Sequence, residues 1–203
     1  MTTTISNQSK EEENKYIERN RFWTEQALNQ FGVATNFFFL IGFAFFAFLI
    51  EKDITKTILP FDCNLKFSVS NFFFVIALII ALLSIILASL TVLSRLNDLR
   101  LTRHVTHVRK KIYKKSNKTL SDKYINIDEY TFFEKICCLY KTIKIRNYFL
   151  NDNDLESVEI TTEKFEKLRL RNLLLARLSW TTFNWQIITL ISSLFVYLLS
   201  VLT

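Results

Sequence analysis

The sequence predicts an all-α membrane protein with three transmembrane helices and a cytoplasmic helical extension between the second and the third. Half of the 203 residues are hydrophobic, and the chain holds only 2 glycines and 1 proline. Strands and hairpins need turn residues that this composition does not supply, whereas long helices need none. Three uncharged runs, at 31–50, 67–94 and 178–203, are each long enough as helices to cross the hydrocarbon core of a bilayer.

Helices that are apolar on all sides occur either in membranes or in the cores of large soluble proteins. A chain of 203 residues is too short to surround three such helices, so we predict that they cross a membrane. The first thirty residues are polar and show no cleavable signal peptide, so the first span is expected to be retained. The predicted segments are a cytoplasmic amphipathic helix at 1–30, transmembrane helices at 31–50, 71–94 and 178–202, a short external loop at 51–70 and a cytoplasmic basic helical region at 95–177.

The distribution of lysine and arginine predicts the orientation in the membrane. Residues 95–177 contain nineteen of these cations against eleven acids, whereas 51–66 contains three cations and three acids. Cytoplasmic loops of membrane proteins carry the excess of positive charge. We therefore expect the N-terminus and the basic region to be cytoplasmic and the extreme C-terminus to lie outside. The net charge of +7 is first of all a topology signal.

The N-terminal segment has the pattern of a helix. Ser9 and Glu12 fit a capping box, in which the side chain of each residue accepts a hydrogen bond from the backbone N–H of the other. Trp23, Ala27 and Phe31 then recur every fourth residue, which is typical of one helix face. We predict that this helix continues directly into the first span.

The second span continues without a helix breaker into a cationic stretch. There the apolar residues Leu101, Val105, Val108 and Ile112 follow a 4-3-4 spacing, which places them on one helix face. The lysines and arginines occupy the other faces. We expect this helix to project from the membrane into the cytoplasm as a stalk.

The rest of the basic region predicts two further helices. Thr131 and Glu134 fit a second capping box, and Asn153 with Glu156 fits the start of the helix that returns to the third span. The apolar stripe of the first of these helices consists of Phe132, Ile136, Leu139 and Ile143, and that of the second of Phe165, Leu168 and Leu175.

The candidate docking residues for a partner or for lipid are four stalk cations, Arg103, Arg109, Lys110 and Lys111. A cationic helix can neutralise the phosphates of a nucleic acid without a recognisable binding fold. Cations next to a span are also what cytoplasmic anchoring requires, and they attract anionic lipid headgroups. The sequence favours anchoring and lipid contact first, contact with an acidic protein or RNA second, and sequence-specific recognition least.

The candidate packing residues within the spans are three amides, Asn36, Asn184 and Gln186, which all lie near the cytoplasmic ends of their spans. Polar side chains at membrane depth are costly unless they are paired. We expect these amides to hydrogen-bond across helices, within one chain or between copies in a homo-oligomer. Trp180 and Trp185 suit anchoring at the membrane interface.

Several kinds of chemistry are disfavoured. His104 and His107 form an H-x-x-H pair on a helix, but the neighbouring cations would repel a metal ion. Signatures of nucleotide-binding loops, serine hydrolases and zinc proteases are absent from the sequence. Cys137 and Cys138 fall in the expected cytoplasmic region, where thiols stay reduced, and Cys63 falls in the external loop, so no intrachain disulfide is expected. We predict that the protein is not an enzyme and uses no cofactor and no small-molecule substrate.

Three blocks of the sequence, RNRFWTEQALNQFG, SRLNDLRLTRHVTHVRKK and LARLSWTTFNWQ, resemble small bacterial membrane proteins of unknown activity. The layout of spans plus cytoplasmic helices is similar to that of the two- or three-span effectors of bacterial anti-phage systems, including SLATT-type and retron-associated transmembrane proteins. The blocks cover less than a quarter of the chain and carry no catalytic residues over.

This resemblance implies an abortive-infection effector that is silent in the inner membrane. A cytoplasmic sensor, such as a reverse transcriptase with its RNA or a nucleotide-signal synthase, would release it on infection, and the effector would then perturb the membrane. Two other functions compete with this interpretation. One is a non-conducting membrane scaffold that recruits a cytoplasmic partner, and the other is a constitutive small channel.

Overall fold

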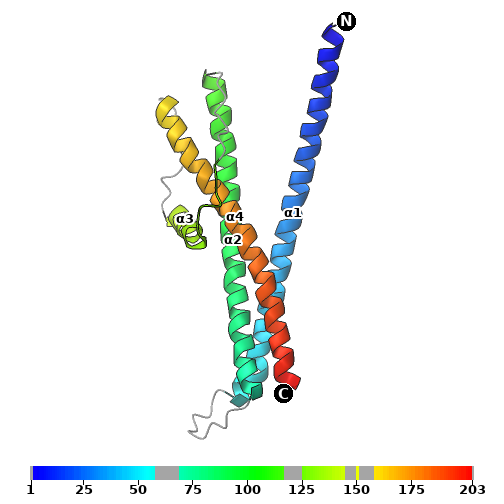
Figure 1. Cartoon of the computed structure of the whole chain (residues 1–203), viewed down its shortest axis with the longest axis vertical. Helices are drawn as coiled ribbons and strands as arrows, with labels where there is room; N and C mark the ends of the chain where they lie inside the picture. Colours follow the sequence, from blue (N-terminus) through cyan, green and yellow to red (C-terminus); the bar gives the residue numbers. More distant parts are fainter. Residues whose placement is uncertain (1, 58–68, 117–124, 145–149, 151–157, 203) are drawn as a thin grey trace.

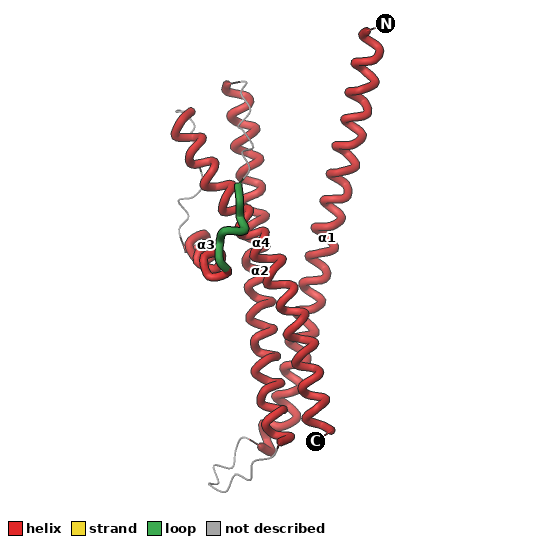
Figure 2. Tube along the Cα trace, viewed as in Figure 1, coloured by secondary structure: helices red, strands yellow, loops and turns green. Residues whose placement is uncertain are grey.

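The computed structural model of the chain describes residues 2–57, 69–116, 125–144, 150 and 158–202. Secondary structure in these ranges is helical, with a turn before the third helix, so the all-α prediction is confirmed for them (Figure 2). The four helices are α1 (Thr2–Thr57), α2 (Val69–Ser116), α3 (Phe132–Lys144) and α4 (Val158–Leu202).

Three of these helices are long and apolar enough to cross a membrane, within the segments Thr24–Lys52, Val69–Ile112 and Thr162–Leu202. Large apolar side chains point outward along all three, as the membrane prediction requires. A soluble protein rarely exposes contiguous apolar surface of this extent, whereas lipid tails cover it. Examples of these exposed side chains are Val33, Leu40 and Phe43 on α1, Ile79, Leu82 and Ile86 on α2, and Ile188, Ile191 and Phe195 on α4.

The helix α1 is longer than the sequence pattern predicted. It begins at Thr2, so Ser9 lies inside the helix and does not cap its start, which corrects the predicted capping box. The first thirty residues contain neither glycine nor proline, so nothing interrupts a helix before Ser9. At its other end α1 continues to Thr57, beyond the predicted end of the first span at residue 50.

The helices α2 and α4 form one long antiparallel hairpin (Figure 1). As predicted, α2 continues unbroken from the second span to Ser116. The predicted start of the returning helix at Asn153 lies outside the described residues, and α4 is described from Val158. The name extension is used below for the part of this hairpin that comprises residues 95–116 of α2 and 158–177 of α4.

The extension has its own apolar core, to which α3 contributes. The buried side chains of this core are Leu101, Val105, Val108, Leu139, Leu150, Phe165, Leu168, Leu175 and Leu178, with Ile112 and Ile136 packed against them. Most of the stripe residues predicted from the sequence are therefore in the core. Phe132 and Ile143 of the α3 stripe are instead exposed.

The start of α3 confirms the predicted capping box. The Thr131 backbone N–H donates to the Glu134 carboxylate at 2.7 Å, and the Glu134 backbone N–H donates to the Thr131 hydroxyl at 3.3 Å. The first of these bonds lowers the pKa of Glu134. Because the charged form is the one that accepts, the stabilisation is present at neutral pH and is lost as pH falls through this lowered pKa.

Thr131→Ala is expected to speed amide hydrogen exchange in the first turn of α3 about fivefold, since an N-cap hydroxyl is lost. Hydrogen exchange monitored by mass spectrometry measures this, with Thr106→Ala as the control because Thr106 is an exposed threonine that bonds within its own helix. Acidification through the lowered pKa of Glu134 instead removes the carboxylate that accepts from the Thr131 N–H, so in the wild type the protection factors of this turn, corrected for intrinsic exchange at each pH, should fall. Equal exchange in the two variants would contradict the capping role.

Candidate functional site

The contact between α2 and α4 within the membrane is lined by small and polar residues, which we call the polar seam. Four hydrogen bonds cross it from side-chain hydroxyls. Ser70 donates to the Ser200 carbonyl, and Ser193 donates to the Ala77 carbonyl at 2.6 Å. Ser84 donates to the Gln186 carbonyl at 3.1 Å, and Thr91 donates to the Thr182 hydroxyl at 2.9 Å.

The seam has the seven-residue period of a coiled coil. On α2 the contacting positions 70, 77, 84 and 91 are seven residues apart, and on α4 the positions 200, 193 and 186 match the first three in the opposite direction, whereas the partner of Thr91 is Thr182, four residues from 186. A seven-residue repeat keeps one face of each helix against the other along a left-handed supercoil. The hairpin therefore keeps a single register from Ser70 to Ser84, opposite Ser200 to Gln186.

Small residues are what helix association in lipid requires. Lipid tails are as apolar as leucine, so helices in a bilayer associate through close backbone approach and hydrogen bonds. The Ala77 carbonyl accepts from Ser193 in the seam, and Ala81 and Ala88 are buried on the adjoining face of α2, where Ala81 packs in a cluster with Leu49 of α1. In the extension the same two faces change to leucine, valine and phenylalanine, which suits burial away from water. This change of composition falls near residues 94 and 178, where the uncharged runs end.

Gln186 lies inside the polar seam with an unsatisfied amide. Its side chain is 1% exposed. Neither its Nε2 nor its Oε1 has a hydrogen-bond partner among the residues that the structure describes. A buried polar group without a partner costs about 1–3 kcal/mol. The closed hairpin therefore contains a group that would be more stable where it could hydrogen-bond.

The other two predicted amides do not join Gln186. Asn36 and Asn184 are exposed, on α1 and α4 respectively. The three amides therefore do not form one layer within a single chain. Asn184 cannot face the seam together with Gln186, because residues two apart on a helix point about 200° away from each other. A role between copies of the chain stays a prediction for the two exposed amides.

All three long helices meet at a second cluster, which we call the junction. It consists of Phe31 on α1, Arg95 and Asp98 on α2, and Trp180 and Phe183 on α4. The Phe31 ring centroid lies 4.3 Å from that of Trp180 and 5.0 Å from that of Phe183. The Arg95 guanidinium carbon is 5.5 Å from the Phe31 centroid, a cation–π distance.

Arg95 and Asp98 form a buried ion pair at this junction. Their side chains are 14% and 5% exposed, and the guanidinium donates to the carboxylate one helical turn away. A buried charge is tolerable only when it is paired. The Asp98 carboxylate thus neutralises Arg95, and the Phe31 ring covers the Arg95 guanidinium.

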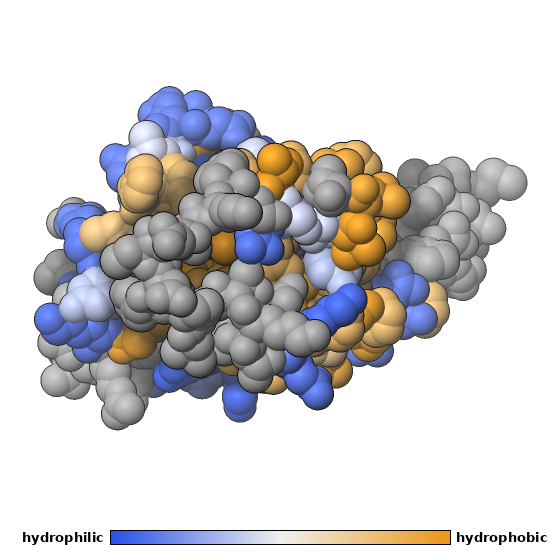
Figure 3. Space-filling view, turned by 90° about the horizontal axis from the view of Figure 1, so that it is seen from below, coloured by the Kyte–Doolittle hydropathy of each residue, from blue (hydrophilic) through white to orange (hydrophobic). Residues whose placement is uncertain are grey.

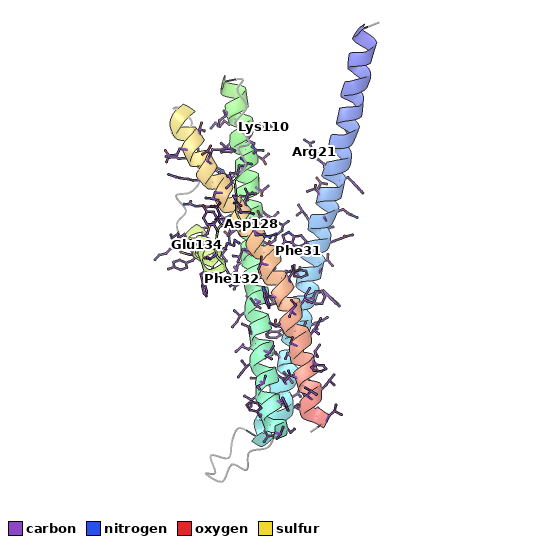
Figure 4. All side chains as sticks on the ribbon, viewed as in Figure 1. Arg21, Phe31, Lys110, Asp128, Phe132 and Glu134 are labelled. Carbon is purple, nitrogen blue, oxygen red and sulfur yellow. The ribbon has the colours of Figure 1, made fainter. Side chains whose placement is uncertain are left out.

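Beyond the junction, α1 leaves the bundle. Glu18, Arg21, Phe22 and every residue from 24 to 30 are exposed, whereas Phe31, Thr35 and Leu49 are buried. Figure 1 shows the N-terminal half of α1 diverging from the extension, and in Figure 4 the side chain of Arg21 lies on this separated half and that of Phe31 at the point of contact. The junction therefore holds the angle between α1 and the hairpin.

The four predicted docking cations have different surroundings. Arg103 and Lys110 are exposed on the outer face of the extension. The Arg109 guanidinium carbon is 5.6 Å from the Phe165 centroid, so this arginine also covers the core of the extension. Lys111 is half-buried. Arg103 and Lys110 are thus the best placed of the four for contact with a partner.

His104 has a structural contact. Its Nε2 accepts a hydrogen bond from the Leu150 backbone N–H at 3.0 Å. The bond ties Leu150 to α2 in the extension. That ring nitrogen is therefore occupied by the backbone and is not available to a ligand in this conformation.

The junction and the seam were both missed by the sequence interpretation. The seven-residue spacing of Ser70, Ala77, Ser84 and Thr91 is readable in the sequence, as is an arginine three residues before an aspartate at the end of the second apolar run. Comparison with family models, curated proteins and solved structures finds no match to this chain. Function must therefore be argued from the geometry.

Proposed function

We propose that the protein is an inner-membrane effector of a bacterial anti-phage system that perturbs the membrane when a cytoplasmic sensor releases it. The unsatisfied amide of Gln186 carries this proposal. A closed hairpin with such a group at its centre is destabilised relative to any arrangement in which the amide meets water or the amide of a second copy. The unsatisfied amide raises the free energy of the silent state, so less energy is needed to leave that state on release.

The orientation and partner belong to the same proposal. The N-terminus and the extension lie in the cytoplasm, since the lysines and arginines concentrate there. A cytoplasmic sensor protein or protein–RNA complex holds Arg103 and Lys110, which are exposed on the extension. Release permits α1 to move at the junction and the hairpin to open, and copies of the chain then associate through Asn36 and Asn184.

Membrane potential in bacteria tests the proposal. Induction of the protein alone is expected to depolarise the inner membrane, as reported by a voltage-sensitive dye, and co-expression of its genomic neighbours should prevent this. Gln186→Met, which fills the same space without an amide, is expected to abolish depolarisation. The matched control is Thr189→Val, because the hydroxyl of Thr189 bonds within its own helix.

A second variant tests the docking surface. Arg103→Glu combined with Lys110→Glu should depolarise even when the neighbours are present, whereas Arg103→Lys with Lys110→Arg should stay suppressed. Both variants must first be shown to insert normally, because these charges also set topology. A steady potential on induction and throughout phage challenge would contradict the effector proposal and favour a non-conducting scaffold, which the continuous packing of the hairpin would equally serve.

A further inference from the structure

One face of α3 exposes large apolar side chains that the bundle does not cover. Phe133 is 80% exposed, Tyr140 59%, Ile143 51% and Phe132 36%. Leu139, in contrast, is buried in the core of the extension. The apolar arc of α3 is therefore wider than its contact with α2 and α4. An aromatic helix face of this kind requires a cover.

The position of α3 points to what covers it. Asp128, just before α3, lies 3.8 Å from Arg177, the residue that precedes the predicted third span. Leu139 shares its core cluster with Leu178, the first residue of that span. The helix is thus level with the membrane boundary. Figure 1 shows α3 nearly end-on beside the upright hairpin, so its axis runs across the hairpin and parallel to the plane of a bilayer that the hairpin crosses.

The two sides of α3 differ in polarity, and the apolar side is the one nearer the spans. Phe132 and Glu134 are two residues apart and so point to opposite sides of the helix. In Figure 4, Phe132 lies on the side nearer the C-terminal end of the bundle, where the spans are, and Glu134 lies farther from it. Lys141 follows Glu134 by seven residues and shares its side. The apolar side thus faces the acyl chains, and the polar side faces the headgroups and water.

The charges of α3 indicate which lipid would be bound. Lys135, Lys141 and Lys144 oppose a single acid in the helix, Glu134. The Lys144 ammonium nitrogen is 5.6 Å from the Tyr140 centroid, at the edge of the apolar face. Lysines in this position reach the headgroup layer while their stems stay on apolar surface. In Figure 3, which views the molecule from the end that holds the C-terminus, hydrophobic atoms are exposed among the long helices and hydrophilic atoms lie mainly along the edges.

We propose that α3 is an interfacial helix, which lies in the headgroup layer of the bilayer that its own spans cross and binds anionic phospholipid there. Phe132, Phe133, Tyr140 and Ile143 enter the boundary between headgroups and acyl chains, and the lysines contact the headgroup phosphates. The proposal requires that the three long helices span a bilayer. It does not depend on what the protein does when it is released.

Cys137 offers a native position for a probe, because it is exposed on the outer edge of this face. Burial raises the pKa of the Cys138 thiol, so Cys138 is the less reactive of the two. A variant with Cys63→Ser and Cys138→Ser carries an environment-sensitive NBD label at Cys137, in nanodiscs that hold one copy of the full chain. The control carries the same label at Arg103→Cys in a chain without other cysteines. In discs with phosphatidylglycerol, we expect the label at Cys137 to emit at shorter wavelength than the control and to be quenched about threefold less by acrylamide.

Two variants separate the aromatic from the ionic contribution. Phe133→Ser with Tyr140→Ser should return the emission to that of the aqueous control, while Lys141→Gln with Lys144→Gln should remove the difference between phosphatidylglycerol and pure phosphatidylcholine discs. Far-UV circular dichroism confirms that each variant keeps its helix content. An aqueous spectrum at Cys137 in both lipids would overturn the proposal, and so would protection that occurs only in discs with two copies, which would assign the face to self-association.

Discussion

Ala88→Leu is expected to lower the free energy of unfolding by about 3 kcal/mol, because the buried face of α2 beside the polar seam has no space for a larger side chain. Ala88 is 1% exposed and lies between Ser84 and Thr91 on α2. Three added carbons must displace a helix that packs against this face of α2, which strains the adjacent seam bonds of Ser84 and Thr91. In lipid no hydrophobic effect compensates for that separation, since lipid tails solvate the exposed faces as well as a neighbouring helix does.

The neighbouring residue supplies the control. Ser89 is exposed on the same helix and bonds only to the Ile85 carbonyl, within α2. Ser89→Leu therefore adds a side chain of the same size to the lipid-facing surface, and the expected change in stability is within about 0.5 kcal/mol. Unfolding in mixed micelles with increasing SDS, followed by tryptophan fluorescence, measures both variants. Equal midpoints would show that no helix packs closely against α2 at this position.

The sequence was sufficient to predict the helices but not how they pair. Runs without charge identify spans because charged groups are costly in hydrocarbon, and the capping box at Thr131 identifies the start of α3 by local hydrogen bonds. The pairing of α2 with α4 is a different kind of information. All three spans are uniformly apolar, so hydrophobic periodicity does not distinguish a buried face from a lipid-facing one. Only the spacing of alanine, serine and threonine carries that distinction.

The sequence predicted where the three amides lie along their helices, but not which way their side chains point. Asn36, Asn184 and Gln186 were expected near one end of the spans, yet only Gln186 is buried in the seam. Depth follows from position along the chain, whereas the direction of a side chain depends on the register between helices. Arg95 and Asp98 were overlooked for a related reason. Charges next to a span are usually topology signals, and the sequence does not show that Phe31 of α1 packs over the Arg95 guanidinium.

Asp98→Ala is expected to destabilise the protein by about 2 kcal/mol and to free the N-terminal half of α1. Removing one partner of a buried ion pair leaves the other charge uncompensated, at a cost of about 3–5 kcal/mol in a protein interior. Arg95 is 14% exposed at the membrane boundary, so it can partly reach water and the expected loss is smaller. As Arg95 turns outward, its contact with the Phe31 ring is lost, and with it one of the contacts that fix α1 to the hairpin.

Spin labels at Glu25→Cys on α1 and Arg103→Cys on α2, in a chain without other cysteines, report this angle through electron–electron distance measurements in nanodiscs. The wild-type background should give one narrow distance distribution and Asp98→Ala a broad one. Arg95→Met combined with Asp98→Leu removes both charges, so it should restore most of the stability and the narrow distribution, because an apolar pair is tolerated where a lone charge is not. A broad distribution in the wild type would mean that the junction does not hold α1, whereas a narrow one in all three proteins would mean that the aromatic contacts alone suffice. A narrow distribution in the wild type, a broad one in Asp98→Ala and a narrow one in the double variant would together show that the ion pair controls the angle of α1.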